Sequence, residues 1–513
     1  MVKTSKTILQ DLELDEIIDW FEIKLPNSDD YLSFHRAAIT DYLSSDLEIL
    51  RQRQKAIGLL LENEPLCQAL YSLLDLHAQV RQLSSKHGSD DRASISNYID
   101  ARRQVRSLLP QLHGLLNDTW GIQVFERLKA ELEELFESGA LDRIDQWDKT
   151  YVEQELVPRS MRVLLAVDEL FLIREFQIRD FSQGTYENTL TGCVYSLTRE
   201  KALEKLNVFS GKGDQIVNAL FSGHLQDPYG DNTIFNDALD QNIAQFEQDT
   251  YLLLSSCFRF LEQAEEDIVF LLKCAEFCRK AQSLGTAACF PTLCETRDKV
   301  YAAREAYSFA LADRMKKRGW NLSDTLVKNP VEFDRPNSAL VVTGANQGGK
   351  TVYLQTIGMI QFLAQLGVMV PASQAQVSPV DAIVTIFAGQ EEKLGQGQLS
   401  AEFDLLLQSL RQANGNSLIL LNEIFTLCDP QDGVLFSRQA LYALMAMGAR
   451  SVWVTHLFEL ALPLEEGDPI TSLVMAVTDQ DHRPVYRIRR SPPDYRSYAA
   501  ESIKSFQNQE RPV

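Results

Sequence analysis

The clearest chemical signal in the sequence is a short glycine-rich run that ends in a lysine and a threonine. It reads Gly344-Ala345-Asn346-Gln347-Gly348-Gly349-Lys350-Thr351 and fits the phosphate-binding (Walker A) pattern G-x-x-x-x-G-K-T. Glycines let backbone N–H groups face phosphate oxygens, and the helix that follows adds the positive end of its dipole. Lys350 would bridge the β- and γ-phosphates, and the Thr351 hydroxyl would bind Mg²⁺. The sequence therefore predicts a site for the cofactors ATP and Mg²⁺, with phosphate contacts from Gly344, Asn346, Gly348, Gly349 and Lys350.

The residues on either side of this loop support the same interpretation. An apolar, strand-like run over 339–343 precedes it, and a helix-like run over 352–367 follows it. A phosphate-binding loop requires this order of strand, loop and helix. We therefore expect the loop to lie at the carboxyl end of a strand.

A second phosphate-site element is expected to be an apolar strand that ends in acidic residues, and 417–423 supplies it. Glu423 would polarise the attacking water. The preceding residue normally is Asp, which holds Mg²⁺, but here it is Asn422. A hydrogen bond to a charged acceptor is stronger than one to a neutral acceptor by roughly 1–2 kcal/mol. Because Asn422 is neutral, turnover or Mg²⁺ handling should fall roughly 5- to 30-fold. The sequence predicts an ATPase that is slow because of Asn422, or a nucleotide-binding switch, with Mg²⁺ held by Thr351 and Asn422.

Two further positions are candidates for the site. The apolar run 451–455 is followed by His456, which could donate a hydrogen bond to the γ-phosphate. The Gly-rich segment 395–400 ends in Ser400, which could cap a helix over 401–412. Such a helix N-terminus also binds anions, and in ATPases that dimerise head to tail it binds the partner's γ-phosphate. A plain helix cap explains Ser400 equally well, so both interpretations stay open.

The charge of the chain limits the partners that it could have. The sequence has 513 residues and a formal net charge of −21, and such a surface repels duplex DNA unless basic residues are concentrated locally. Basic residues cluster at 102–106, 314–318 and 483–490, and each cluster alone is interpreted as solvated surface charge. The sequence has no apolar run of about 18 residues and does not begin with a signal-peptide pattern. We expect a cytoplasmic protein without membrane segments.

The periodicity of apolar residues changes at about residue 321. Before it the pattern is helical almost throughout, with helices expected over about 96–117, 120–138, 150–180, 199–222, 233–284 and 294–317. After it short apolar strands alternate with helices, as in an α/β sheet. The expected strands are 339–343, 382–387, 417–422, 451–455, 472–477 and 484–489.

This change predicts the fold class α + α/β. An all-helical core and lever domain is expected over 1–320, with room for a reduced clamp within about 180–240. A P-loop ATPase domain is expected over 321–500, followed by a C-terminal tail over 501–513. The long helices could serve as levers or form a plain helical bundle, and the periodicity does not separate these alternatives.

Two segments resemble the MutS family of mismatch-repair ATPases. Residues 343–351 look like the family's T-G-x-N-x-G-G-K-[ST] loop, and Thr455-His456-Leu457-Phe458-Glu459-Leu460 is similar to its T-H-x-x-E-L element. The resemblance covers about 325–500. It implies a P-loop NTPase domain of the ABC-like type that forms a homodimer. It also implies that Ser400 reaches the partner's nucleotide, Glu423 acts on the water and His456 contacts the γ-phosphate.

The sequence departs from the family's pattern at several places. It starts directly at the core region, so we expect the mismatch-reading module to be absent. It ends at Val513, before the family's C-terminal dimerisation helices. Where the family has a Gly-Arg-Gly-Thr-like loop after the catalytic Glu, this chain has Phe425-Thr426-Leu427-Cys428-Asp429-Pro430. Leu326 stands near the position of an aromatic residue that usually stacks on adenine.

The resemblance therefore implies a MutS-like, ATP-dependent DNA-binding protein that does not read mismatches. In that hypothesis ATP binding and hydrolysis close a homodimer and move the helical levers. The alternative is a nucleotide-gated protein-interaction module with weak hydrolysis and no direct DNA contact. The net charge and Asn422 favour this alternative.

Overall fold

A computed structural model provides the fold of most of the chain. It describes residues 2–25, 31–32, 38–85, 94–119, 121–148, 160–167, 173–182, 248–335, 338–345, 348–387, 403–404, 406–407, 410–425, 429–463, 467–478 and 484–493. The chain forms two compact units. The first unit consists of Met1–Lys24, Asp29–Glu64 and Val269–Val513, and the second of Leu25–Ser28 and Pro65–Ile268.

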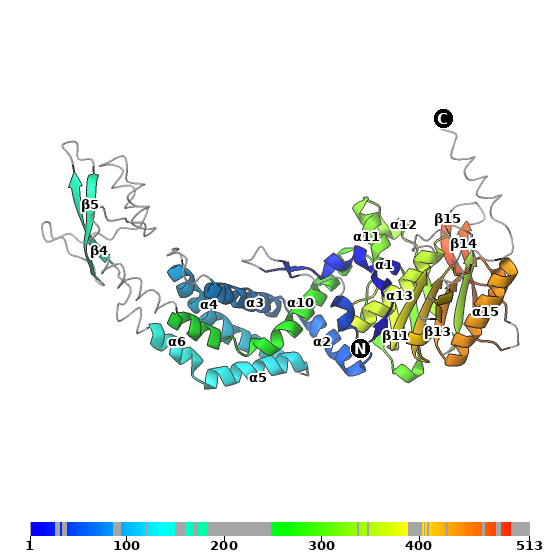
Figure 1. The fold of residues 1–513 in the computed structure, drawn as a ribbon, viewed down its shortest axis with the longest axis horizontal. Coiled ribbons are helices and arrows are strands. Elements are labelled where there is room, and N and C mark those ends of the chain that lie inside the picture. Colours follow the sequence, from blue (N-terminus) through cyan, green and yellow to red (C-terminus); the bar gives the residue numbers. More distant parts are fainter. Residues whose placement is uncertain are drawn as a thin grey trace, which may run out of the picture. The chain divides into compact units, whose positions relative to one another are not determined.

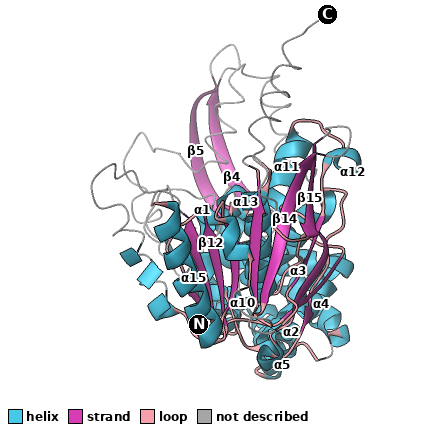
Figure 2. Ribbon diagram, turned by 90° about the vertical axis from the view of Figure 1, so that its right-hand side faces the viewer, coloured by secondary structure: helices cyan, strands magenta, loops and turns pink. Residues whose placement is uncertain are grey.

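The centre of the first unit is a seven-stranded sheet (Figure 1). Its strands, in spatial order, are β1 (Lys3–Thr4), β11 (Ala382–Phe387), β12 (Ser417–Asn422), β13 (Arg450–Val454), β9 (Ala339–Gly344), β14 (Ile470–Thr478) and β15 (Pro484–Arg490). All neighbours pair in parallel except β14 and β15, which form an antiparallel edge (Figure 2). The six strands expected after residue 338 are all present.

Two long helices cover opposite faces of this sheet (Figure 1). They are α13 (Lys350–Leu366) and α15 (Pro430–Met447). Leu420 of β12 faces α13, where its side chain approaches Gly358, whereas Leu421 packs in the core that α15 covers. Because both faces are covered, the central strands are almost entirely buried and read as mainly apolar runs.

A smaller, four-stranded sheet packs beside α13 in the same unit. Its order is β6 (Thr292–Leu293), β10 (Gln374–Val377), β7 (Tyr301–Ala306) and β8 (Asn329–Glu332). The Tyr301 hydroxyl donates to the Ile357 carbonyl of α13 over 2.6 Å. The buried Arg450 guanidinium donates to the carbonyls of Lys299 and Val300. These bonds join the two sheets and the phosphate-loop helix into one body.

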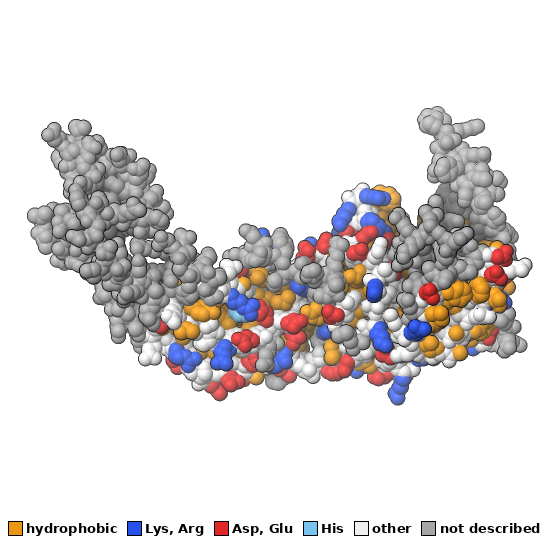
Figure 3. Space-filling model, viewed as in Figure 1, with side chains coloured by type: hydrophobic (Ala, Val, Ile, Leu, Met, Phe, Trp, Pro, Cys, Tyr) orange, Lys and Arg blue, Asp and Glu red, His pale blue; other side chains and the backbone are white. Residues whose placement is uncertain are grey.

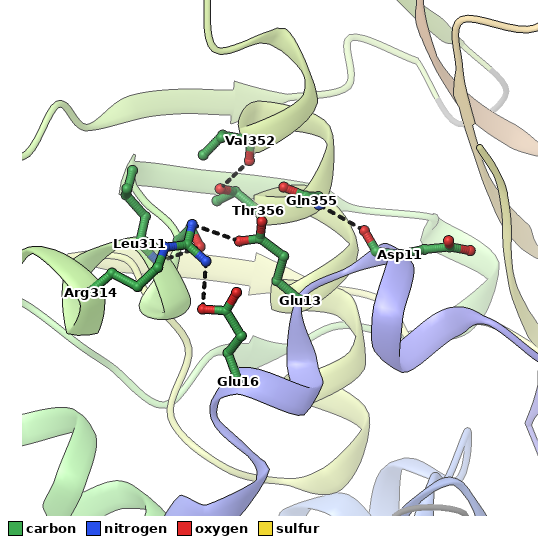
Figure 4. Close-up of polar contacts among 9 residues, drawn as sticks. Asp11, Glu13, Glu16, Leu311, Arg314, Val352, Gln355 and Thr356 are labelled. Carbon is green, nitrogen blue, oxygen red and sulfur yellow. Dashed lines mark hydrogen bonds and ion pairs between the residues drawn. The ribbon is translucent and has the colours of Figure 1, made fainter. Parts of the chain in front are cut away.

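The N-terminal segment belongs to this unit rather than to the helical region in which the sequence analysis placed it. Strand β1 adds the edge strand beside β11, and α1 (Ile8–Asp11) follows it. Gln355 of α13 donates to the Asp11 carbonyl over 2.9 Å, and Arg314 of α11 (Phe309–Lys317) pairs with Glu13 and Glu16 (Figure 4). The unit also contains α2 (Leu47–Glu62), α12 (Leu322–Thr325) and the short pair β2 (Ile23–Lys24) and β3 (Tyr31–Leu32).

The described part of the second unit is mainly helical. It holds α3 (Glu64–Ser85), α4 (Ser94–Leu115), α5 (Gln123–Glu137), α6 (Ala140–Asp148) and the first residues of α10 (Leu261–Ser283). The helices expected over 96–117 and 120–138 are confirmed as α4 and α5. The side chain of Arg81 in α3 pairs with Glu265 of α10 at 2.9 Å.

Three of the expected helices are wrong in whole or in part. Within 150–180 the chain forms an antiparallel hairpin of β4 (Ser160–Val167) and β5 (Ile173–Ser182). Over 294–317 it forms β7 before α11, because the strand pairs with β10 and β8. The helix expected over 233–284 is interrupted by a turn at 257–260, where the hydroxyls of Ser255 and Ser256 bond to nearby carbonyls in competition with the helix.

Some expectations fall where the structure gives no description. The helix over 199–222, most of the proposed clamp region 180–240 and the tail 501–513 lie outside the described residues. Within the described ranges, no helix combines the length and the apolar character that a bilayer crossing requires.

Candidate nucleotide-binding site

The strand order brings three loops of the first unit together. Strand β13 lies between β12 and β9, and all three run parallel. Their carboxyl ends therefore meet at one edge of the sheet, the edge where α/β folds bind ligands. Strand β12 ends in Asn422 and is followed by Glu423, His456 follows β13, and the phosphate-binding loop begins at the end of β9.

The phosphate-binding loop has the backbone that its glycines allow. Gly344 has φ +136°, and a Cβ there would lie 2.8 Å from the Met475 carbonyl oxygen. Gly349 has φ +88° and stands at the start of α13. The Lys350 ammonium donates to the carbonyls of Gly344 and Ala345, each over 2.9 Å. Burial lowers the pKa of Lys350, and the loop wraps around its side chain. Gly348 is part of the described loop, whereas Asn346 lies outside the described residues.

The two predicted Mg²⁺ ligands lie next to each other. The Thr351 hydroxyl donates to Oδ1 of Asn422 over 3.3 Å. Thr351 stands in the first turn of α13, and Asn422 is the last residue of β12. Side-chain oxygens of this kind are ligands that Mg²⁺ accepts, usually together with several waters.

Glu423 and His456 form a direct contact that the sequence analysis did not anticipate. The two atoms His456 Nε2 and Glu423 Oε1 are 3.0 Å apart, and Lys350 Nζ lies 4.0 Å from the same oxygen. The close contact with His456 is the largest cause that lowers the pKa of Glu423, and the charge of Lys350 acts in the same direction. The Glu423 carboxylate therefore stays ionised and points between the lysine and the histidine. The contact forms because β13 is the neighbour of β12 in the sheet. The order of strands in a sheet cannot be read from the sequence pattern.

Comparison with known proteins shows which family this part of the chain resembles. Residues 340–504 match the family described as MutS domain V. The endonuclease MutS2 of Thermomicrobium roseum is 36% identical over 138 residues, which are 26% of this chain and 17% of that protein. The endonuclease MutS2 of Geobacillus kaustophilus is 30% identical over 164 residues, 32% of this chain and 21% of that protein.

The DNA mismatch repair protein MutS of Chlorobium phaeovibrioides is 29% identical over 217 residues, 39% of this chain and 25% of that protein. Over this region the chain is similar to proteins of the MutS family. The resemblance inferred from the two sequence motifs is thereby confirmed. The aligned region spans a quarter or less of the length of these three curated relatives.

Two of the expectations drawn from the MutS family concern Leu326 and Ser400. Leu326, at the end of α12, is buried and 8% exposed. Ser400 lies outside the described residues, as does the start of the helix that it would cap. The contribution of Ser400 to the site therefore stays a prediction.

Tyr486 is a site residue that the sequence analysis missed. A Cβ on Gly349 would lie 3.8 Å from the Tyr486 ring, so the ring flanks the phosphate-binding loop. Tyr486 has φ +46° at an irregularity in the pairing of β14 and β15. Asn329 holds it there by donating to the Tyr486 carbonyl and accepting from the Ile488 amide. A tyrosine in a strand-like run carries no sequence signal for this position.

Proposed function

We propose that this chain is a MutS-like ATPase that binds ATP with Mg²⁺ and hydrolyses it slowly. The observation that carries the proposal is the convergence of Lys350, Thr351, Asn422, Glu423 and His456 at one edge of the sheet. The position of β13 between β9 and β12 supports a P-loop NTPase domain of the ABC-like type.

Each side chain has a role that follows from its chemistry. The glycines of the loop and Lys350 bind the β- and γ-phosphates. Thr351 and Asn422 supply oxygens for Mg²⁺, which neutralises phosphate charge when it is bound. Glu423 accepts a proton from the attacking water, and the contacts with His456 and Lys350 lower the pKa of its carboxylate further. Tyr486 covers the loop at Gly349 and contacts the nucleotide beyond the triphosphate.

Hydrolysis is slow in this proposal because Asn422 brings no charge to Mg²⁺. The neutral amide oxygen accepts from Thr351 as a carboxylate would, but attracts a divalent cation less strongly. The expected deficit is roughly 5- to 30-fold in turnover.

We further propose that ATP binding closes a homodimer through the ATPase domain and that the closed dimer binds DNA. Apolar side chains gather on the surface over α15 (Figure 3), where Leu435 is 52% and Met447 38% exposed. Exposed apolar patches of this kind mark interaction surfaces. The names of the MutS relatives support DNA as the partner, whereas the net charge of −21 favours a second candidate, a nucleotide-gated protein-interaction module.

ATP hydrolysis by the full chain tests the first part of the proposal. Lys350→Ala should abolish hydrolysis and weaken ATP binding, because it removes the cation that faces the phosphates. Lys317→Ala is the matched control, since Lys317 is an exposed lysine of α11 in the same unit. If both variants hydrolyse ATP as fast as the wild type, ATP is not hydrolysed at this site.

DNA binding tests the second part. Labelled matched duplex, mismatched duplex and branched junction DNA would be titrated with and without ATP and Mg²⁺, across a salt series. Affinity that falls steeply with salt and responds to ATP supports the DNA-binding proposal. Absence of binding at low salt would favour the protein-interaction module.

A further inference from the structure

The turn after β12 holds two residues in an unusual backbone conformation. Glu423 has φ +54° and Phe425 has φ +57°. Left-handed backbone is unfavourable for residues with a bulky side chain, and it persists only where the surrounding structure imposes it. Two such residues within three positions, one of them carrying the proposed catalytic carboxylate, indicate that this turn is held by strong packing.

The packing comes from a cluster of three aromatic rings, Phe403, Phe425 and Phe436. The Phe425 side chain is 1% exposed. Its ring centroid lies 4.9 Å from that of Phe403 and 6.0 Å from that of Phe436, while the other two rings meet edge to face at 4.8 Å. Aromatic pairs at these separations and angles attract one another beyond the effect of burial. The phenylalanine cluster therefore fixes the side chain of Phe425 on both sides.

The backbone of the turn is fixed as well. A Cβ on Gly433 of α15 would lie only 2.8 Å from the Phe425 carbonyl oxygen, so the first turn of α15 packs directly on this peptide. The Glu423 amide donates to the Val454 carbonyl over 2.8 Å. These two contacts hold the turn in a conformation in which the Glu423 carboxylate lies 3.0 Å from His456.

We propose that Phe425 is a positioning residue, whose ring in the phenylalanine cluster holds the strained turn and thereby aims the Glu423 carboxylate at the attacking water. This inference rests on the proposed ATPase function. Phe425 touches neither nucleotide nor water in this proposal. Its effect passes through the backbone from residue 425 to residue 423, so it should change the chemical step and leave ATP binding to Lys350 and Thr351.

Three substitutions of the full chain separate the contributions of the ring and the turn. Phe425→Ala removes the ring and keeps the unfavourable backbone, Phe425→Gly removes both, and Phe425→Leu keeps apolar bulk. We expect kcat of the alanine and glycine variants to fall roughly 10- to 100-fold, because small misplacements of a catalytic group cost this much. KM and the Kd for ATP should stay within about twofold. The leucine variant should recover part of the lost turnover.

Phe125→Ala is the matched control, since Phe125 is a fully buried phenylalanine of α5 in the other unit. It should lower Tm as Phe425→Ala does, with kcat unchanged at a temperature where both variants are folded. Phe436→Leu perturbs the phenylalanine cluster without changing a residue of the turn. It should also lower kcat, by a smaller factor than Phe425→Ala does. It covers the case in which the residue 425 variants do not fold.

The outcomes distinguish failure of this inference from failure of the proposed function. A wild-type protein that does not hydrolyse ATP in a Lys350-dependent manner refutes the proposed function itself. An active wild type with unchanged kcat in Phe425→Ala, or in Phe436→Leu if the former does not fold, refutes the positioning role. Parallel loss of kcat and ATP affinity also refutes it, because it would show a general disruption of the site.

Discussion

Replacing Asn422 by Asp is the most direct test of how the site treats Mg²⁺. Oδ1 of Asn422 already accepts a hydrogen bond from the Thr351 hydroxyl at 3.3 Å, so an Asp at this position needs no new geometry. The substitution changes a neutral acceptor into a charged one, a difference of roughly 1–2 kcal/mol. At 25 °C that corresponds to a rise in Mg²⁺-dependent turnover of roughly 5- to 30-fold.

The same substitution has a second, independent consequence for stability. The carboxylate that Asn422→Asp introduces would share the site with the Glu423 carboxylate, and like charges in one site repel each other. In EDTA the variant should therefore melt at a lower temperature than the wild type. A ligand that binds only the folded state stabilises it by mass action, so added Mg²⁺ with ATP should raise Tm more in the variant than in the wild type.

Phosphate release measured over a Mg²⁺ titration, together with melting curves under the same conditions, provides both readouts. Asn321→Asp is the matched control, because Asn321 caps α12 through its side-chain oxygen and Asp caps helices equally well. It adds the same charge to the same unit and should change neither turnover nor its Mg²⁺ dependence. Unchanged turnover in a folded Asn422→Asp protein would refute the argument that the missing charge limits the site.

Other predictions follow from packing, burial and the position of Tyr486. Gly358→Ala should destabilise the fold by about 1–3 kcal/mol in urea unfolding, because a Cβ there would lie 2.4 Å from Leu12 Cδ2. Gly58→Ala in α2, with no heavy atom within 4 Å of the added Cβ, should instead stabilise it by about 0.5–1 kcal/mol. Burial raises the pKa of the Asp11 carboxyl above 3.8, so the folded protein holds this proton more tightly than the unfolded chain does. The free energy of unfolding therefore falls as pH rises from the unfolded-state pKa of Asp11 through its folded-state pKa. Asp11→Asn should reduce the loss of Tm between about pH 4 and pH 7, and an unchanged slope would contradict this assignment. Tyr486→Ala should weaken ATP binding roughly 5- to 150-fold in calorimetry, whereas Tyr486→Phe should bind almost as the wild type does.

The sheet of the first unit could be predicted from the sequence because of how it is buried. Strands β9, β11, β12 and β13 are covered on both faces, so each reads as a mainly apolar run, with Thr385 as the polar residue inside β11. The N-terminal strand β1 spans only Lys3–Thr4 and owes its conformation to pairing with β11. A run of two residues carries no periodicity, so only the tertiary pairing reveals it.

The helical region was less predictable for a related reason. In 173–182 the apolar residues Ile173, Phe176, Ile178 and Phe181 are spaced by two or three positions, a spacing that suits a helix nearly as well as a strand. Pairing with β4 decides in favour of the strand. Local patterns therefore predict elements well where burial is two-sided, and poorly where one long-range pairing decides.

The candidate site likewise has one part that the sequence predicts and another that only the fold shows. The phosphate-binding loop is contiguous, so its residue types alone reveal it. The Glu423–His456 contact requires the order of three strands, and the roles argued for Phe425 and Tyr486 require backbone dihedrals that neither residue type suggests. Long-range order and strained backbone are the parts of a site that only the fold can show.

Strain is concentrated around the site of this protein. Among the described residues, six other than glycine have clearly positive φ, and three of these are Glu423, Phe425 and Tyr486. Each such conformation costs of the order of 1–3 kcal/mol, and glycine would remove most of that cost at any of them. Yet all three carry large side chains, each held in place by specific packing or hydrogen bonds: Phe425 by the phenylalanine cluster, Tyr486 by Asn329, and Glu423 by Val454 and His456. The fold thus gives up stability to direct these side chains, which is the pattern expected where geometry matters more than stability.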